Sequence, residues 1–238
     1  MALVASLAVL ALVLGACSPA APVPDAATGP SVPSARGAPV TDLRLHDAAT
    51  RGDLAGIASL LGEGLPIDGR DATGRTPVLA ATHARQTAAV AALIDAGADL
   101  DLQDDRLDNV FLYAGAEGLL DILRLANEAG ADPAITNRFG GVAVIPASER
   151  GHVEVVRYLL DESDVDVDHV NRLGWTALLE AIILSDGGPA HQEIVGMLLA
   201  AGADPELDDN EGVTPLAHAR SRGYAEIERL LLDAGATR

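Results

Sequence analysis

The chain repeats itself with a period of 33 residues. A Gly-Ala-Asp motif begins at positions 97, 130 and 202, and a related Gly-Ala-Thr begins at position 235. The first and last intervals are both 33 residues, and the middle interval of 72 equals two periods and six further residues. A period of this length is the signature of an architecture in which each unit is stable only against its neighbours. The sequence therefore predicts a stack of small units in place of one globule around a single centre.

Each period contains the signals for two short helices. Thr76 and Thr214 are good helix N-caps, and the prolines that follow them suit the first helical position, where no backbone donor is needed. A second apolar helix follows, as over 153–160, 194–199 and 227–232, and we expect the leucine pairs at 159–160, 198–199 and 231–232 to face inward. The glycine of each Gly-Ala-Asp motif should end that helix in the left-handed conformation. Small residues that let neighbouring units approach closely recur at one phase: Ala81, Ala114, Ala147, Ala181 and Ala219.

This pattern resembles the ankyrin repeat. Residues 71–103 open as D-x-x-G-x-T-P and close through Leu93 and Ile94 into the motif at position 97. The resemblance implies an all-α repeat solenoid, a stack of about six helix-turn-helix units with β-hairpin loops. The six units span 41–70, 71–103, 104–136, 137–170, 171–208 and 209–238.

Two units depart from this pattern, and a third carries an insertion. In the third unit Asn109 replaces the capping threonine and Leu107 replaces the turn glycine. In the fourth, Val142 offers no cap and Pro146 falls inside the first helix, where it removes a backbone donor, so we expect that helix to start late or fray. The insertion near 185–189 lengthens the turn between the helices of the fifth unit. It either serves a binding face or is a neutral surface loop.

The resemblance implies a protein-binding surface made of the loop tips and the exposed side of the first helices. Large apolar residues gather on adjacent tips at Phe139, Leu173 and Trp175. Tryptophan is a frequent energetic anchor of interfaces, although Trp175 could equally cover the neighbouring loop. Arginines on the same side could bind carboxylates of a partner bidentately, or could form a merely solvated face. The residues assigned to partner binding are Arg75, Arg106, Arg138, Phe139, Arg150, Arg172, Leu173, Trp175 and Arg222.

The N-terminal stretch is interpreted as a targeting signal. Residues 1–16 carry no charged side chain and are too few to span a bilayer, which needs roughly 20 apolar residues. The run Leu14-Gly15-Ala16-Cys17 resembles the lipobox of bacterial lipoproteins, which implies lipidation of Cys17 and removal of 1–16. No basic residue precedes the apolar run, which departs from the usual signal. Residues 17–40 hold six prolines and predict an extended tether, so 41–238 would form the repeat domain.

Composition argues against nucleic-acid binding and catalysis. The formal net charge is −19, from 35 acidic residues and 16 basic residues, and it repels phosphate backbones. The six histidines do not share a helix face at metal-ligand spacing. The acidic segment 161–168 lacks the glycine turn and terminal glutamate of a calcium loop. With neither a phosphate loop nor a nucleophile elbow in the sequence, we predict a protein that is not an enzyme and needs no cofactor.

These inferences predict a non-catalytic protein-protein interaction module that binds an unknown protein partner and is itself a monomer. The lipid would hold it in the cell envelope of a bacterium, on the periplasmic or extracellular side. Two alternatives remain at this point. The protein could be an immunity or inhibitor protein that masks an effector, or an accessory to an envelope oxidative-stress enzyme.

Overall fold

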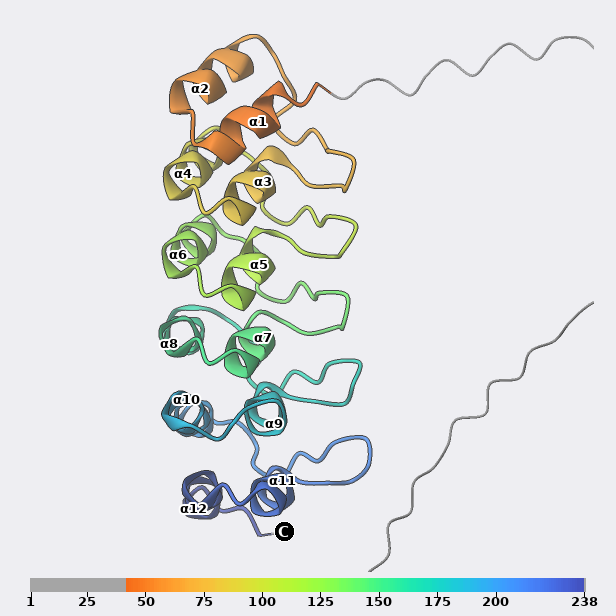
Figure 1. Cartoon of the computed structure of the whole chain (residues 1–238), viewed down its shortest axis with the longest axis vertical. Coiled ribbons are helices and arrows are strands. Elements are labelled where there is room, and N and C mark those ends of the chain that lie inside the picture. The colour runs from red at the N-terminus through yellow and green to blue at the C-terminus, as the bar shows by residue number, and fades with distance from the viewer. Residues whose placement is uncertain (1–41, 238) are drawn as a thin grey trace, which may run out of the picture. The chain divides into compact units, whose positions relative to one another are not determined.

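The computed structural model describes residues 42–237, which form six helix pairs stacked in a row (Figure 1). The predicted all-α solenoid is confirmed, and no strand forms in this range. No helix within it is both long and apolar enough to cross a membrane. The predicted signal 1–16, the tether 17–40 and Cys17 lie outside the described residues. The helices are α1 (Arg44–Arg51), α2 (Leu54–Gly62), α3 (Pro77–His83), α4 (Thr87–Asp95), α5 (Val110–Ala116), α6 (Leu120–Glu128), α7 (Val144–Glu149), α8 (Val153–Glu162), α9 (Ala177–Ile183), α10 (Pro189–Ala200), α11 (Pro215–Arg222) and α12 (Ala225–Asp233).

The core runs along the row of helix pairs. Odd-numbered helices pack on odd-numbered helices, and even-numbered helices pack on even-numbered ones (Figure 1). The five alanines at the shared phase of the odd-numbered helices are all fully buried, which confirms their predicted role as close-approach positions. Of the leucine pairs, the first members Leu159, Leu198 and Leu231 are buried, and Leu160 and Leu199 are partly buried against the core. The expectation was wrong only for Leu232, which is 44% exposed. Consecutive helical residues point about 100° apart, so the second leucine of a pair lies nearer the edge of the core, and Leu232 turns away from it.

Side-chain caps begin most of the first helices. The Thr76 hydroxyl accepts a hydrogen bond from the backbone N–H of Leu79 at 3.4 Å, and Thr214 accepts one from Ala217 at 3.3 Å. Asn109, which replaces the threonine in the third unit, also caps its helix: its side-chain oxygen accepts a hydrogen bond from the backbone N–H of Leu112 at 2.8 Å. The predicted caps are therefore confirmed, and asparagine substitutes for threonine without loss of the helix start.

The first helix of the fourth unit starts late, as predicted. It begins at Val144, one residue after the equivalent of Val110 in the third unit, and is six residues long without a side-chain cap. This start places Pro146 in the first turn, where its missing N–H leaves no helical bond unmade. The N–H of Ile145 bonds to the Val142 carbonyl instead, at 3.1 Å.

Each loop that precedes a first helix is closed by one aspartate or asparagine. The Asp71 carboxylate accepts from the backbone N–H groups of Thr73 at 2.8 Å and Arg75 at 3.0 Å. The same two bonds, two and four residues further along, recur in the later loops at Asp104, Asn137, Asn171 and Asp209. These turns stand where hairpin loops were expected and project to one side of the row (Figure 1). Their internal bonds hold the tips of the loops in place.

Leu107 takes up the conformation of the glycine it replaces. Its φ is +60°, while the equivalent Gly74 and Gly140 have φ values of +78° and +74°. Side chains other than glycine are strained in this left-handed region. The turn therefore forms in the third unit at a cost in free energy that the other units avoid.

Candidate functional site

A groove lies over the third, fourth and fifth units, between the loops and helices α5, α7 and α9. Its cavity volume is about 240 Å³. Five of the nine residues predicted to bind a partner line it: Arg106, Arg138, Phe139, Arg150 and Leu173. The remaining four do not line it: Arg75, Arg172, Trp175 and Arg222. Arg75 and Arg222 belong to units on either side of the groove, whereas Arg172 and Trp175 belong to the loop of Leu173 but do not line the cavity.

Exposed apolar side chains border this groove. Phe139 is 48% exposed and Leu173 is 47% exposed, on neighbouring loop tips. Leu184, which follows α9, is also 47% exposed and lines the same groove. Leu184 was not predicted from the sequence to bind a partner. Arg150 and Arg222 stand at the equivalent position of the neighbouring units, so a leucine there was a visible signal. Three large apolar groups left in water around one cavity are typical of a binding site.

Several of the predicted arginines are engaged within the molecule. Arg75 pairs with Asp71 at 2.9 Å, and the guanidinium of Arg172 donates to the Arg138 carbonyl at 3.0 Å. The Arg222 guanidinium reaches back to the Ile183 carbonyl at 3.3 Å. These three side chains hold a loop or join neighbouring units, so part of the arginine stripe has a structural use.

The arginines at the groove differ in their freedom. Arg150 donates to the Ala116 carbonyl at 2.8 Å and pairs with Glu117. Arg138 is exposed, and its guanidinium lies 4.5 Å from the centre of the Phe139 ring. Arg106 is also exposed, and its contact with the Asp108 carboxylate is long, at 3.9 Å. Arg106 and Arg138 are thus the cations at this groove with the most capacity to meet a partner.

Trp175 has a different position from its apolar neighbours. It is half-buried at the end of its loop, and its backbone N–H donates to the Asn171 side chain at 3.1 Å. The exposed anchors that remain at the groove are Phe139 and Leu173.

Two carboxylates also line the groove: Glu149, at the end of a first helix and so within the predicted surface, and Glu180, which was not predicted from the sequence. Glu149 ends α7, and Glu180 lies within α9 with only 6% of its surface exposed. The Asn171 amide donates to Glu180 Oε1 at 2.8 Å. Burial, together with the charge of Glu149, raises the pKa of Glu180 to about 7. Tyr113 and Pro146 stand at the equivalent position of the third and fourth units. A glutamate at this position of the fifth unit was the signal that could have identified the site.

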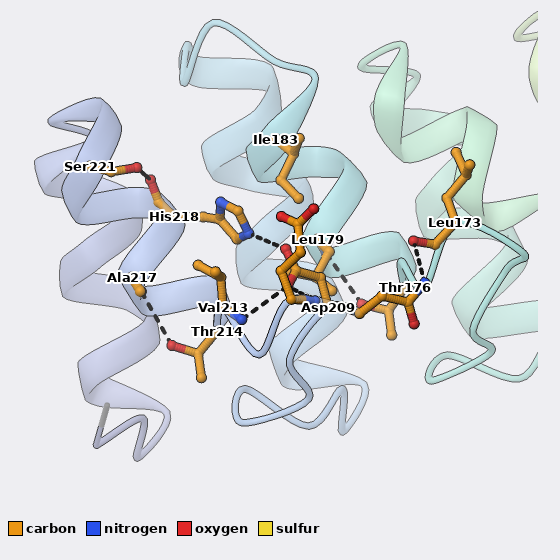
Figure 2. Close-up of polar contacts among 12 residues, drawn as sticks. Leu173, Thr176, Leu179, Ile183, Asp209, Val213, Thr214, Ala217, His218 and Ser221 are labelled. Carbon is orange, nitrogen blue, oxygen red and sulfur yellow. Dashed lines mark hydrogen bonds and ion pairs between the residues drawn. The ribbon is translucent and has the colours of Figure 1, made fainter.

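The last unit has a related contact with the polarity reversed. His218 occupies the place on α11 that Glu180 has on α9, and its Nε2 donates to Asp209 Oδ2 at 2.7 Å (Figure 2). Asp209 in turn occupies the place of Asn171. In both units the side chain that closes the loop bonds to the loop through one of its two polar atoms and contacts the first helix through the other.

Other histidines join neighbouring units. The Nε2 atoms of His46, His152 and His191 lie 2.9, 3.2 and 3.0 Å from backbone carbonyl oxygens of the adjacent unit. Burial is the main cause that lowers the pKa of His152. Nowhere in residues 42–237 do three or more histidine, cysteine, aspartate or glutamate side chains gather to hold a metal ion.

The fifth-unit insertion is anchored to the last unit. Tyr224, which precedes α12, donates from its hydroxyl to the Ser185 carbonyl at 2.7 Å. A side chain at Gly187, where φ is +68°, would collide with the Tyr224 ring. The Gln192 amide also donates to the Gly187 carbonyl at 2.8 Å. These contacts fix the path of the insertion and hold Leu184, which precedes it, beside the groove.

Comparison with known proteins gives one consistent result. Family models of the ankyrin repeat match residues 73–105 and, as three copies, residues 111–209. The ankyrin repeat protein YahD of Escherichia coli (strain K12) is 44% identical over 189 residues, which cover 79% of this chain and 94% of that protein. The crystal structure of an ankyrin repeat domain from Acinetobacter baumannii AYE superposes with a TM-score of 0.80 at 54% identity and covers 82% of this chain and 100% of that one. The ankyrin repeat domain of Bcl-3 gives a TM-score of 0.75 at 25% identity, over 82% of this chain and 87% of that domain.

Proposed function

The chain belongs to the ankyrin-repeat family, and we propose that it is a non-catalytic protein-binding module whose partner occupies the groove over its third, fourth and fifth units. Ankyrin repeats generally mediate protein-protein interaction, and the relatives matched along most of this chain are ankyrin repeat proteins. The observation that supports this groove as the contact surface is the exposure of Phe139, Leu173 and Leu184 around one cavity.

The loops supply the rigidity that such a surface needs. The Asn137 side chain bonds to two backbone N–H groups of its own loop, at 2.9 and 3.1 Å. The Arg172 N–H then joins that loop to the next through the Phe139 carbonyl at 2.8 Å. A surface that is ordered before the partner arrives loses little conformational entropy on binding.

A chemical crosslinking experiment with mass spectrometry tests this proposal. The full chain would be crosslinked to its partner in cells that produce it, alongside a Phe139→Ser/Leu173→Ser variant. The control is Leu54→Ser, which removes an equally exposed leucine on α2, far along the row from the groove. We expect the control to capture the partner and the groove variant to lose it. Equal capture by all three proteins would contradict the proposal.

We also propose that lipid on Cys17 holds the module at the bacterial envelope, facing the periplasm or the exterior. The support for this proposal is the run of residues 14–17 and the apolar stretch before it. The location and the monomeric state are likewise proposals from the sequence.

A further inference from the structure

Two carboxylates on successive first helices line one groove, and within residues 42–237 neither is paired with a cation. Glu149 on α7 and Glu180 on α9 both line the cavity. Glu117 on α5, in contrast, is paired with Arg150. Among residues 42–237, neither Glu149 nor Glu180 forms an ion pair with an arginine, and the single side-chain bond to Glu180 comes from the neutral Asn171 amide. A buried carboxylate without a counter-charge is unfavourable.

The charge of Glu149 adds to this cost. The pKa of Glu180 is raised to about 7, mainly by burial and secondly by the charge of Glu149. A cation placed between the two carboxylates would oppose both effects, because it replaces lost solvation and screens their repulsion.

The remaining charged groups on the helices packed against α9 are already engaged. On α10, His191 bonds to the Glu149 carbonyl and Glu193 pairs with Arg157. On α11 and the loop before it, His218 bonds to Asp209, Arg220 pairs with Glu228, and Arg222 donates to the Ile183 carbonyl. No side chain of these helices is left to neutralise Glu149 and Glu180.

The walls of the groove suit the stem of a long basic side chain. Phe139, Leu173 and Leu184 offer apolar surface beside the two carboxylates. Lysine and arginine bury their methylene stems on such surfaces while the charged end reaches a polar partner. Arg106 and Arg138, at the same groove, would repel a second basic residue.

We infer that the groove selects an exposed protein segment that carries one basic side chain between apolar residues, with the basic group placed between Glu149 and Glu180. This inference rests on the proposed function, since it names the chemistry of the partner for the same groove. The net charge of −19 supports it, because an acidic protein attracts basic segments at long range.

Selection from random linear peptides displayed on phage tests the inference. The full chain would be the target, with a Glu149→Gln/Glu180→Gln variant as the comparison. A Glu128→Gln/Glu154→Gln variant is the matched control, because it removes the same charge from exposed carboxylates on α6 and α8. We expect the wild type and the control to enrich peptides with a single lysine or arginine flanked by apolar residues. The comparison variant should lose that enrichment.

A second measurement does not depend on any variant of the protein. Fluorescence anisotropy would compare a selected peptide with the same peptide carrying norleucine in place of its basic residue. We expect binding to weaken by about tenfold, since a charge-assisted contact is lost. Binding of the basic peptide should also weaken between about pH 8 and about pH 6, as Glu180 takes up its proton.

The outcomes separate this inference from the function on which it rests. Enriched peptides that are neutral or acidic, or a norleucine peptide that binds equally well, would overturn the inference and leave the groove as a binding site. Peptides that bind the Phe139→Ser/Leu173→Ser variant as tightly as the wild type, or a selection that enriches nothing, would overturn both.

Discussion

His218 Nε2 lies 2.7 Å from Asp209 Oδ2, and this contact joins the first helix of the last unit to the loop before it (Figure 2). Asn171 and Glu180 occupy the same two places one unit earlier, 2.8 Å apart. A donor on the helix faces a carboxylate in one unit, and a carboxylate on the helix faces an amide donor in the other. The two positions are therefore chemically coupled.

This coupling predicts the outcome of an exchange. His218→Glu should lower the free energy of unfolding by about 2 kcal/mol, because it places a carboxylate against the buried Asp209. Asp209→Asn should cost less. The double variant should recover most of the loss, since it copies the arrangement of Asn171 and Glu180. Urea denaturation of all four proteins measures the coupling, and strictly additive losses would show that the two side chains act independently.

The pKa of Glu180 predicts a pH-dependent stability. It is raised from 4.5 to about 7 in the folded protein, so the contribution of this group is fully present below 4.5 and is lost as the pH rises through about 7. Glu180→Gln keeps an acceptor for Asn171 and has no charge to bury. We expect it to be more stable than the wild type by on the order of 2 kcal/mol at about pH 8 and equal to it near pH 4.5.

Thermal melts across this pH range would check the difference between the two proteins. The exposed Glu154 is the control site. A change to glutamine there should give a difference in stability from the wild type that does not vary with pH. A wild type that matches the Glu180→Gln variant at high pH would show that the carboxylate is not destabilising.

The positive φ of Leu107 predicts that glycine is a more stable replacement than alanine at this position. Leu107→Gly should raise the free energy of unfolding by about 1 kcal/mol relative to Leu107→Ala, because both lose the side chain and only glycine relieves the left-handed strain. Guanidinium denaturation gives the comparison. A glycine variant less stable than the alanine variant would mean that the entropy of the unfolded chain outweighs the strain.

The lipobox resemblance predicts membrane attachment through one thiol. Cys17→Ser should move the protein from the membrane fraction to the soluble fraction, because no acyl chain can then be attached. Fractionation and metabolic labelling with palmitate measure this. If the serine variant stays with membranes to the same extent, the lipoprotein hypothesis fails and the other predictions are unaffected.

The sequence allowed much of the fold to be predicted, and less of the site. The caps at Thr76 and Thr214 and the late start of α7 were predicted because each depends on residues within one turn. The exposure of Leu232 was missed because facing depends on how a helix is rotated against its neighbours. Glu180 was missed for a related reason: its burial and its raised pKa arise from contacts with α7 and with the preceding loop.

What the sequence alone determined is the unit: its 33-residue period, its helix starts and its glycine endings, which follow from short-range chemistry. Which side chains of different units share a surface was decided only by the tertiary structure. Stacking brought Arg138, Phe139 and Leu173 to one groove with Glu149 and Glu180, and turned Arg172 and Arg222 to backbone carbonyls of neighbouring units. The physical reason is that residues more than 30 positions apart meet through helix packing, which the local pattern within a unit does not specify.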